Sequence, residues 1–161
     1  MAAPATQRPR FALDTNVLID LGEGKPFAQR FLAAYRNSGL VVPPTVVQEL
    51  VHISGIEHKA CHHAMAALVN MRKWNILPYD LISVGHGITE INAQKLMASG
   101  ILPHGEINDG LILVETALGC IRTLVTSDIH LLAINPAELV KKLDEFDLPS
   151  VSIYHPKDIL R

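Results

Sequence analysis

The stretch FALDTNVLIDL, residues 11–21, sets the fold of this 161-residue chain, because it joins a short apolar run through Asp14 to a helical pattern. Residues 10–13 are typical of a short buried strand, and residues 15–21 of a helix that follows it directly. A strand that passes straight into a helix is typical of a parallel sheet. The stretch therefore indicates an α/β protein with a carboxylate at the end of its first strand.

The same alternation continues along the chain and predicts one domain. Further strands are expected within 40–42, 123–128 and 150–154, and helices over 26–36, 57–74, 88–99, 106–117 and 136–146. Residues 74–80 suit either a short strand or an extended connection. Another helix should start at Thr45, which stands three residues before Gln48 in the spacing of a capping box. We expect a three-layer α/β/α fold with a mainly parallel central sheet, formed by residues 10–161 after a leader of residues 1–9.

Three more acidic residues stand beside apolar runs, far from Asp14 in the chain. They are Glu49 in VPPTVVQELVHI, Asp109 in GEINDGLILVETAL and Asp128 in TLVTSDIHLL. Asp14 and Asp128 follow strand-like runs, whereas Glu49 and Asp109 fall in early turns of expected helices. Ligands of an open parallel sheet bind beyond the carboxyl ends of its strands. All four side chains are therefore expected to face one crevice.

A cluster of carboxylates predicts a cation site, because Mg²⁺ and Mn²⁺ prefer oxygen ligands. Such a site points to metal-assisted chemistry on a phosphate. Taken singly, each residue has a simpler explanation. Asp14 and Asp128 suit the N-cap position of a helix, Glu49 suits a solvated helix face, and an acidic residue such as Asp109 stabilises a helix start. Only their joint placement favours the metal site.

Composition restricts the class of protein. Apolar residues make up 48% of the chain and charged residues 19%, which is typical of a globular protein. No apolar run is long enough to span a membrane, and two cysteines without CxxC spacing favour a cytoplasmic location. The net charge of −2 gives no broad basic surface for nucleic acid. The mean hydropathy is slightly positive, which suits self-association through an apolar patch.

Four motifs together resemble the PIN-domain nucleases, and most closely the VapC-like toxins of bacterial toxin–antitoxin pairs. They are LDTNVLIDL, VVQEL, INDGLILVETAL and LVTSD, in that order. The resemblance spans residues 11–155. It implies a Mg²⁺- or Mn²⁺-dependent endoribonuclease with an RNA substrate, an antitoxin partner and a homodimeric assembly.

The resemblance also implies roles for individual residues. The acidic quartet of the family corresponds to Asp14, Glu49, Asp109 and Asp128, which would be both catalytic and metal-binding. Asn16 matches a polar position that orients the first carboxylate, and Thr126 or Ser127 matches a hydroxyl near the last one. Glu106 lies one turn before Asp109 and either shares in metal binding or caps the helix start; the dipole of the helix favours the cap.

Other interpretations of the sequence stay open. The chain could be a catalytically weak or inactive PIN-like module that binds RNA or a protein, although such a module has no need of four mutually repelling carboxylates. A phosphoaspartate enzyme would carry a second Asp two positions after the first, where this chain has Asn16. His58 and His62 share a helical spacing that can bind Zn²⁺, but the four-ligand spacing of a closed zinc site is missing, so contact with solvent or RNA is favoured.

Overall fold

A parallel sheet forms the centre of the computed structural model, which describes residues 8–102 and 106–160. Within these ranges the sheet has five strands in the order β3-β2-β1-β4-β5, and every neighbouring pair is parallel. The strands are β1 Arg10–Leu13, β2 Gly39–Val42, β3 Ile76–Pro78, β4 Thr123–Val125 and β5 Ser152–Tyr154. The expected mainly parallel sheet is confirmed. The expected leader lies for the most part outside the described residues.

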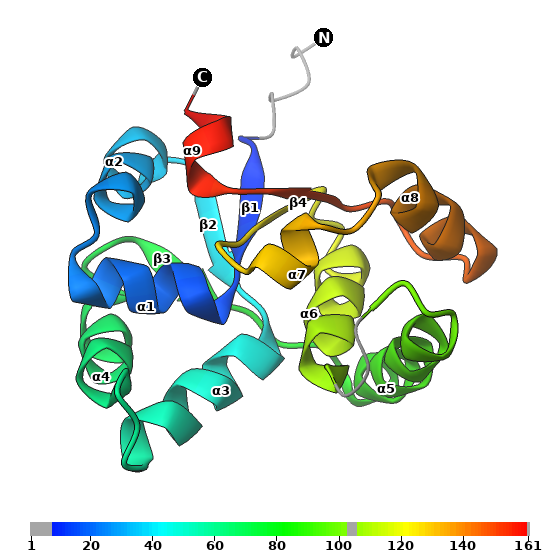
Figure 1. Ribbon diagram of the computed structural model, residues 1–161, viewed down its shortest axis with the longest axis horizontal. Coiled ribbons are helices and arrows are strands. Elements are labelled where there is room, and N and C mark those ends of the chain that lie inside the picture. The colour runs from blue at the N-terminus through cyan, green and yellow to red at the C-terminus, as the bar shows by residue number, and fades with distance from the viewer. Residues whose placement is uncertain (1–7, 103–105, 161) are drawn as a thin grey trace, which may run out of the picture.

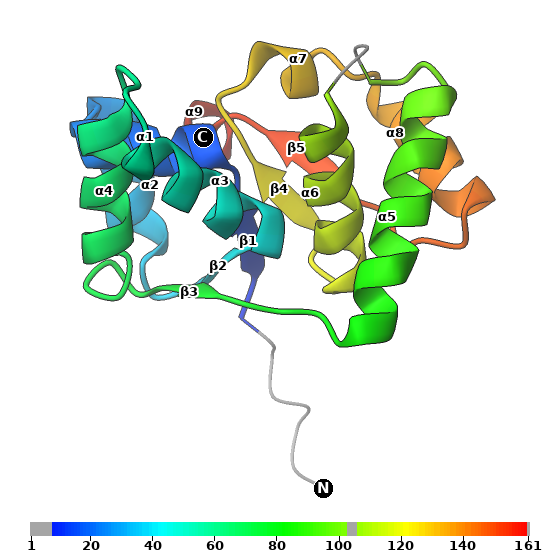
Figure 2. The same ribbon diagram turned by 90° about the horizontal axis from the view of Figure 1, so that it is seen from below.

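Helices cover both faces of the sheet (Figures 1 and 2). Helices α1 Thr15–Glu23, α2 Pro26–Tyr35, α3 Pro44–Gly55 and α4 Cys61–Asn70 lie on one side. The connection from β3 to β4 contains helices α5 Ser83–Ala98 and α6 Ile107–Leu118. The connection from β4 to β5 contains the short α7 Ile129–Leu132 and α8 Pro136–Glu145. Helices α5, α6 and α8 lie on the other side of the sheet in Figure 2. A final turn, α9 Pro156–Ile159, contacts α2. The three-layer α/β/α architecture is therefore confirmed.

The strand order creates a switch point between β1 and β4. From β1 the chain moves outward to β2 and β3, and it then returns across the sheet to place β4 on the other side of β1. Crossovers that leave two neighbouring strands toward opposite faces open a crevice at the carboxyl ends of those strands, where ligands of such folds bind. Asp14 follows β1 and Asp128 lies three residues beyond β4, so both stand at this crevice.

The core that fixes this geometry is apolar on both faces of the sheet. Leu13, Leu40 and Leu124, one from each of the three inner strands, are fully buried. On the α1–α4 side, the ring of Phe31 stands nearly perpendicular to that of Phe11, with centroids 6.2 Å apart. Burial of such side chains contributes roughly 1.5–3 kcal/mol each, so the strand ends are held on a rigid base.

Three local expectations need correction. The helix expected over 57–74 is shorter, because residues 57–60 form a bend and turn in which the Ala60 N–H donates to Nδ1 of His58 at 3.0 Å. At the other end, Asn75 adopts a φ of 59° in the turn that leads into β3. The helix over 88–99 begins earlier, at Ser83. The helical turns α7 and α9 were not expected.

The start of α3 also differs from the capping box. The helix begins at Pro44, and its N-cap residue makes no side-chain capping bond. Glu115 of α6 takes that role from across the sheet, since its carboxylate accepts from the Thr45 N–H at 3.0 Å and from the Thr45 hydroxyl at 2.7 Å. Burial raises the pKa of Glu115, and the two bonds from Thr45 oppose that rise. The described ranges contain no helix long and apolar enough to cross a membrane.

Candidate active site

Asp14 is the most constrained carboxylate at the switch point. It stands at the N-cap of α1 and is only 3% exposed. Its Oδ1 accepts from the Thr15 N–H at 2.7 Å, and its Oδ2 accepts from the Thr126 hydroxyl at 2.7 Å. Burial raises the pKa of Asp14 to about 6, although both hydrogen bonds act to lower it. The expected N-cap role is thus confirmed, and it leaves the side chain beside the other acidic residues.

Asp128 is held in a similar way beyond the end of the neighbouring strand, β4. It caps α7, with Oδ1 accepting from the His130 N–H at 2.7 Å. Its own N–H donates to the Thr126 hydroxyl oxygen at 2.9 Å, so Thr126 contacts both carboxylate-bearing residues. The Asn16 side-chain amide lies 3.5 Å from Oδ2 of Asp128. Asn16 therefore contacts the last carboxylate of the quartet, whereas the sequence predicted that it orients the first.

Glu49 comes from the second turn of α3 and is oriented by two donors. The Thr15 hydroxyl donates to its Oε2, and the Asn108 side-chain amide donates to its Oε1 at 2.7 Å. These donors belong to α1 and α6, so Glu49 joins helices from both sides of the sheet. Thr15 and Asn108 were missed by the sequence reasoning. Their position directly beside Asp14 and Asp109 in the chain is the signal that could have found them.

Asp109 lies in the first turn of α6, where the side chain is 8% exposed. Its Oδ2 is buried and has no hydrogen-bond partner among the described residues. Burial raises the pKa of Asp109 to about 7, and the negative charges of Asp14 and Asp128 add to the rise. A buried acceptor without a donor is costly unless a ligand satisfies it. Asp109 is thus the side chain of the site that most needs a positive partner.

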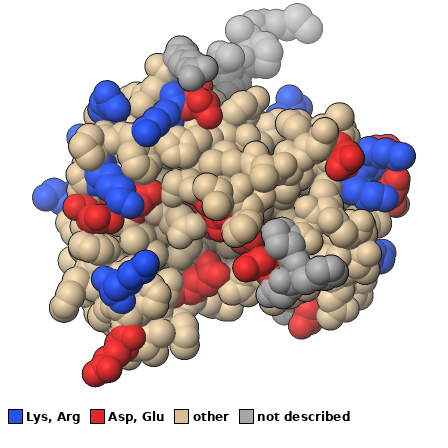
Figure 3. All heavy atoms as spheres, viewed as in Figure 1, with Lys and Arg blue, Asp and Glu red and all other residues tan. Residues whose placement is uncertain are grey.

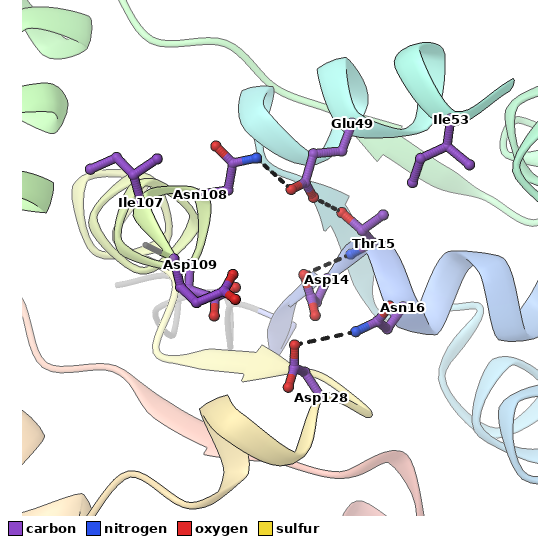
Figure 4. A pocket seen from close by; sticks show the side chains of 10 residues that line it. Asp14, Thr15, Asn16, Glu49, Ile53, Ile107, Asn108, Asp109 and Asp128 are labelled. Carbon is purple, nitrogen blue, oxygen red and sulfur yellow. Dashed lines mark hydrogen bonds between the residues drawn. The ribbon is translucent and has the colours of Figure 1, made fainter. Parts of the chain in front are cut away.

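These residues line one cavity of about 280 Å³, the acidic pocket (Figure 4). Figure 3 shows acidic side chains in a hollow near the middle of the same face. The pocket is lined by Asp14, Thr15, Asn16, Glu49, Ile53, Glu106, Ile107, Asn108, Asp109 and Asp128. Glu106 occupies the N-cap position of α6, but its side chain makes no capping bond. It is exposed, lines the pocket and helps to raise the pKa of Asp109.

Two predicted residues lie behind the pocket. Thr126 is fully buried and connects Asp14 to the backbone of Asp128. Ser127 turns away, and its hydroxyl donates to Asp20 at 2.6 Å. The buried Asp20 also pairs with Lys25 at 2.6 Å, so the loop that carries Asp128 is tied to the end of α1. Asp20 was missed, because an Asp on a helix after a strand looks like a solvated residue.

The carboxylates share a pocket, but their oxygen atoms are not close enough together to coordinate one metal ion. Across residues 8–102 and 106–160, no three His, Cys, Asp or Glu side chains are close enough to form a ready metal cage. The expected zinc-binding spacing of His58 and His62 forms no such group either, and Nδ1 of His58 instead accepts from the Ala60 N–H. Repulsion among the carboxylates is expected to hold them apart until a cation neutralises them. The catalytic and metal-binding roles of the quartet stay predictions.

Comparisons with known proteins agree on the fold. No protein-family model and no curated protein matches the chain by sequence. Among solved structures, it is similar to a chain of VapBC2 from Rickettsia felis bound to a DNA fragment from their promoter, with TM-score 0.60, 17% identity, and coverage of 91% of this chain and 98% of that one. It is also similar to a chain of VapBC-1 from nontypeable Haemophilus influenzae, with TM-score 0.55, 19% identity, and coverage of 92% and 98%. At these identities the likeness shows the fold alone, and the α/β/α fold shared with chains of two VapBC structures agrees with the one that the resemblance of the motifs implied.

Proposed function

We propose that this chain is a Mg²⁺- or Mn²⁺-dependent endoribonuclease that hydrolyses RNA phosphodiester bonds. The observation that carries the proposal is the convergence of four carboxylates from four separate elements on one pocket at the switch point of the sheet. Assembling four acidic groups costs free energy, as the raised pKa values of Asp14 and Asp109 indicate. A bound cation would offset this electrostatic repulsion, which is the reason to expect one at this pocket.

The residues present fit a hard divalent cation. Every charged group in the acidic pocket is a carboxylate, and one carboxylate oxygen, Oδ2 of Asp109, is buried without a donor. Asp14, Glu49, Asp109 and Asp128 would hold the cation. When bound, it supplies Lewis-acid activation of the phosphate and of the attacking water.

The side chains of the chain itself would orient the reaction. Thr126 and the backbone of Thr15 fix the Asp14 carboxylate, while Asn108 fixes Glu49. Because these donors are already in place, Asp14 and Glu49 are each oriented before substrate arrives. Ile53 and Ile107 line the pocket on either side of Glu49 and Asn108 in Figure 4 and exclude water from part of it. Glu106 lines the pocket close to Asp109 and is exposed to solvent.

We also propose that the protein acts as the toxin of a toxin–antitoxin pair in the cytoplasm, held inactive by its antitoxin. The likeness of the fold to chains of two VapBC structures supports this role. A homodimer is proposed on separate grounds. Val51 on α3 and Val69 on α4, two helices in contact, are 55% and 72% exposed, and burying such residues favours self-association. Light scattering coupled to gel filtration would measure the mass in solution.

The nuclease proposal is tested by incubating the purified protein with structured RNA and Mg²⁺ or Mn²⁺. Asp14→Asn and Asp128→Asn should each abolish cleavage, as should EDTA. Asp144→Asn, which changes an exposed residue of α8 away from the pocket, is the matched control and should cleave normally. Absence of cleavage with either metal, together with absence of metal binding in calorimetry, would instead indicate an inactive PIN-like module that binds RNA or a protein.

A further inference from the structure

A second cavity, of about 500 Å³, lies next to the acidic pocket and shares Asn16 with it. We call it the flanking cavity. It lies between α1 and the start of α4 and includes Ser127, the neighbour of Asp128. It is lined by Asn16, Ile19, Asp20, Glu23, Lys25, His58, Lys59, Ala60, His63 and Ser127. Whatever extends from the acidic pocket past Asn16 enters this space.

The walls of the flanking cavity are held by specific packing. Helices α1 and α4 approach closely at Gly22, where a Cβ atom would overlap the backbone carbonyl of His63. On the floor, buried Asp20 accepts from Ser127 and from Lys25, and Lys25 also pairs with Glu23 at 3.3 Å. Lys25 therefore offsets one of the two negative charges, and with Lys59 the charged side chains that line the cavity sum to zero. The cavity thus lacks the net negative charge that the acidic pocket carries.

The remaining polar groups of the cavity are suited to anions. Lys59 is exposed at its edge. Because Nδ1 of His58 accepts from the Ala60 N–H, the ring proton of neutral His58 is on Nε2, where it can be donated to a ligand. The dipole of α4, which starts at Cys61 beside the cavity, acts in the same direction. Figure 3 shows Lys and Arg side chains to the left of the central acidic hollow, with Asp and Glu side chains among them.

We propose that the flanking cavity binds backbone phosphates of single-stranded RNA next to the bond cleaved in the acidic pocket. This inference rests on the proposed nuclease function. A polyanion cannot lie along a cluster of carboxylates unless neighbouring phosphates find positive or donor groups. His58, Lys59 and His63 supply such groups in the cavity that shares Asn16 with the acidic pocket. An acidic peptide is less suited, because only Ile19 and Ala60 among the lining residues offer apolar surface to anchor one.

The test measures binding, not cleavage. Affinity for a fluorescent 12-nucleotide single-stranded RNA is followed by anisotropy in Mg²⁺, with every variant made in the Asp14→Asn background. Lys59→Ala should weaken binding about five- to tenfold and reduce the slope of log K against log salt by about 0.7, the value for one lost contact to single-stranded nucleic acid. Lys73→Ala is the matched control, because Lys73 is exposed three residues beyond the other end of α4. It should change the affinity less than about twofold.

A second variant separates phosphate contact from folding. His58→Asn keeps an acceptor for the Ala60 N–H, but its only donor is on a shorter side chain that does not reach the position of Nε2, so it should weaken RNA binding without changing the melting temperature. Equal effects of Lys59→Ala and Lys73→Ala, or no RNA binding by any variant, would overturn the inference. The inference would also be overturned if Lys59→Ala and His58→Asn bound RNA normally but lost affinity for hexaglutamate, because that result would indicate a peptide site.

The two proposals fail separately. If the unmodified protein cleaves RNA but Lys59→Ala and His58→Asn bind it normally, the flanking cavity has no role in RNA binding and the nuclease function stands. If no cleavage occurs but the two variants lose affinity as expected, the nuclease function fails and the phosphate site stands as part of an RNA-binding module.

Discussion

The hydroxyl of Thr126 donates to Oδ2 of Asp14 at 2.7 Å and accepts from the N–H of Asp128 at 2.9 Å. One buried side chain therefore links the two acidic residues that follow the neighbouring strands β1 and β4. Thr126→Val keeps the shape but leaves Oδ2 of Asp14 without this donor, so it should lower the free energy of unfolding by about 1–3 kcal/mol. It should also raise the pKa of Asp14 and reduce cleavage most strongly at low pH. Urea unfolding and a pH–rate profile would measure both effects.

The control for that variant is Thr123→Val, because Thr123 is half-buried in β4, three residues before Thr126, and lies outside the acidic pocket. Equal losses of activity in both variants would mean that the hydroxyl of Thr126 has no special role.

The metal-free protein should become less stable as the pH rises from about 4 to 7. Burial raises the pKa of Asp14 to about 6 and that of Asp109 to about 7, above the ordinary value of 3.8. The folded state thus binds more protons than the unfolded state in this window, so the free energy of unfolding falls with rising pH, by on the order of 5 kcal/mol for the two groups together. Melting temperatures in EDTA would show the fall, and Mg²⁺ should reverse most of it at pH 7. Asp109→Asn should flatten the EDTA curve; an unchanged slope would contradict this assignment.

Asn108 should matter for activity more than for stability. Its exposed amide donates to Oε1 of Glu49 at 2.7 Å, and Thr15 holds the other oxygen. Asn108→Ala should free one end of Glu49 and lower kcat about tenfold, with a change in unfolding free energy below about 1 kcal/mol. Gln48→Ala, next to Glu49 but exposed and outside the pocket, should leave both unchanged. A loss of stability equal to the loss of activity would show that Asn108 acts through the fold.

The close contact of α1 with α4 makes Gly22 intolerant of a side chain. A Cβ there would overlap the His63 carbonyl, so Gly22→Ala should cost about 2–4 kcal/mol or force the helices apart. Gly55→Ala at the end of α3 meets nothing within 4 Å and should be neutral or stabilise by about 0.5–1 kcal/mol. Chemical denaturation of the two variants would compare them directly. Equal stabilities would show that the backbone yields at Gly22.

The sequence alone determined the layers of the fold and the position of the acidic residues relative to the strands. Alternating apolar patterns and the carboxylates that cap helices are local features, so residues 10–13 and Asp14 could be interpreted without knowing any distant partner. The short helices α7 and α9 were missed, because one helical turn leaves too few residues to show a period.

Only the tertiary structure decided which donor holds which carboxylate. Asn16 lies beside Asp128 and not Asp14, Ser127 bonds Asp20, and the start of α3 is capped by Glu115 from α6. Each of these pairs is at least 70 residues apart in the chain. Such contacts depend on the order in which the strands join the sheet and on how closely the helices pack. No local pattern carries that information, because a hydroxyl or an amide can serve any acceptor that the fold brings within reach.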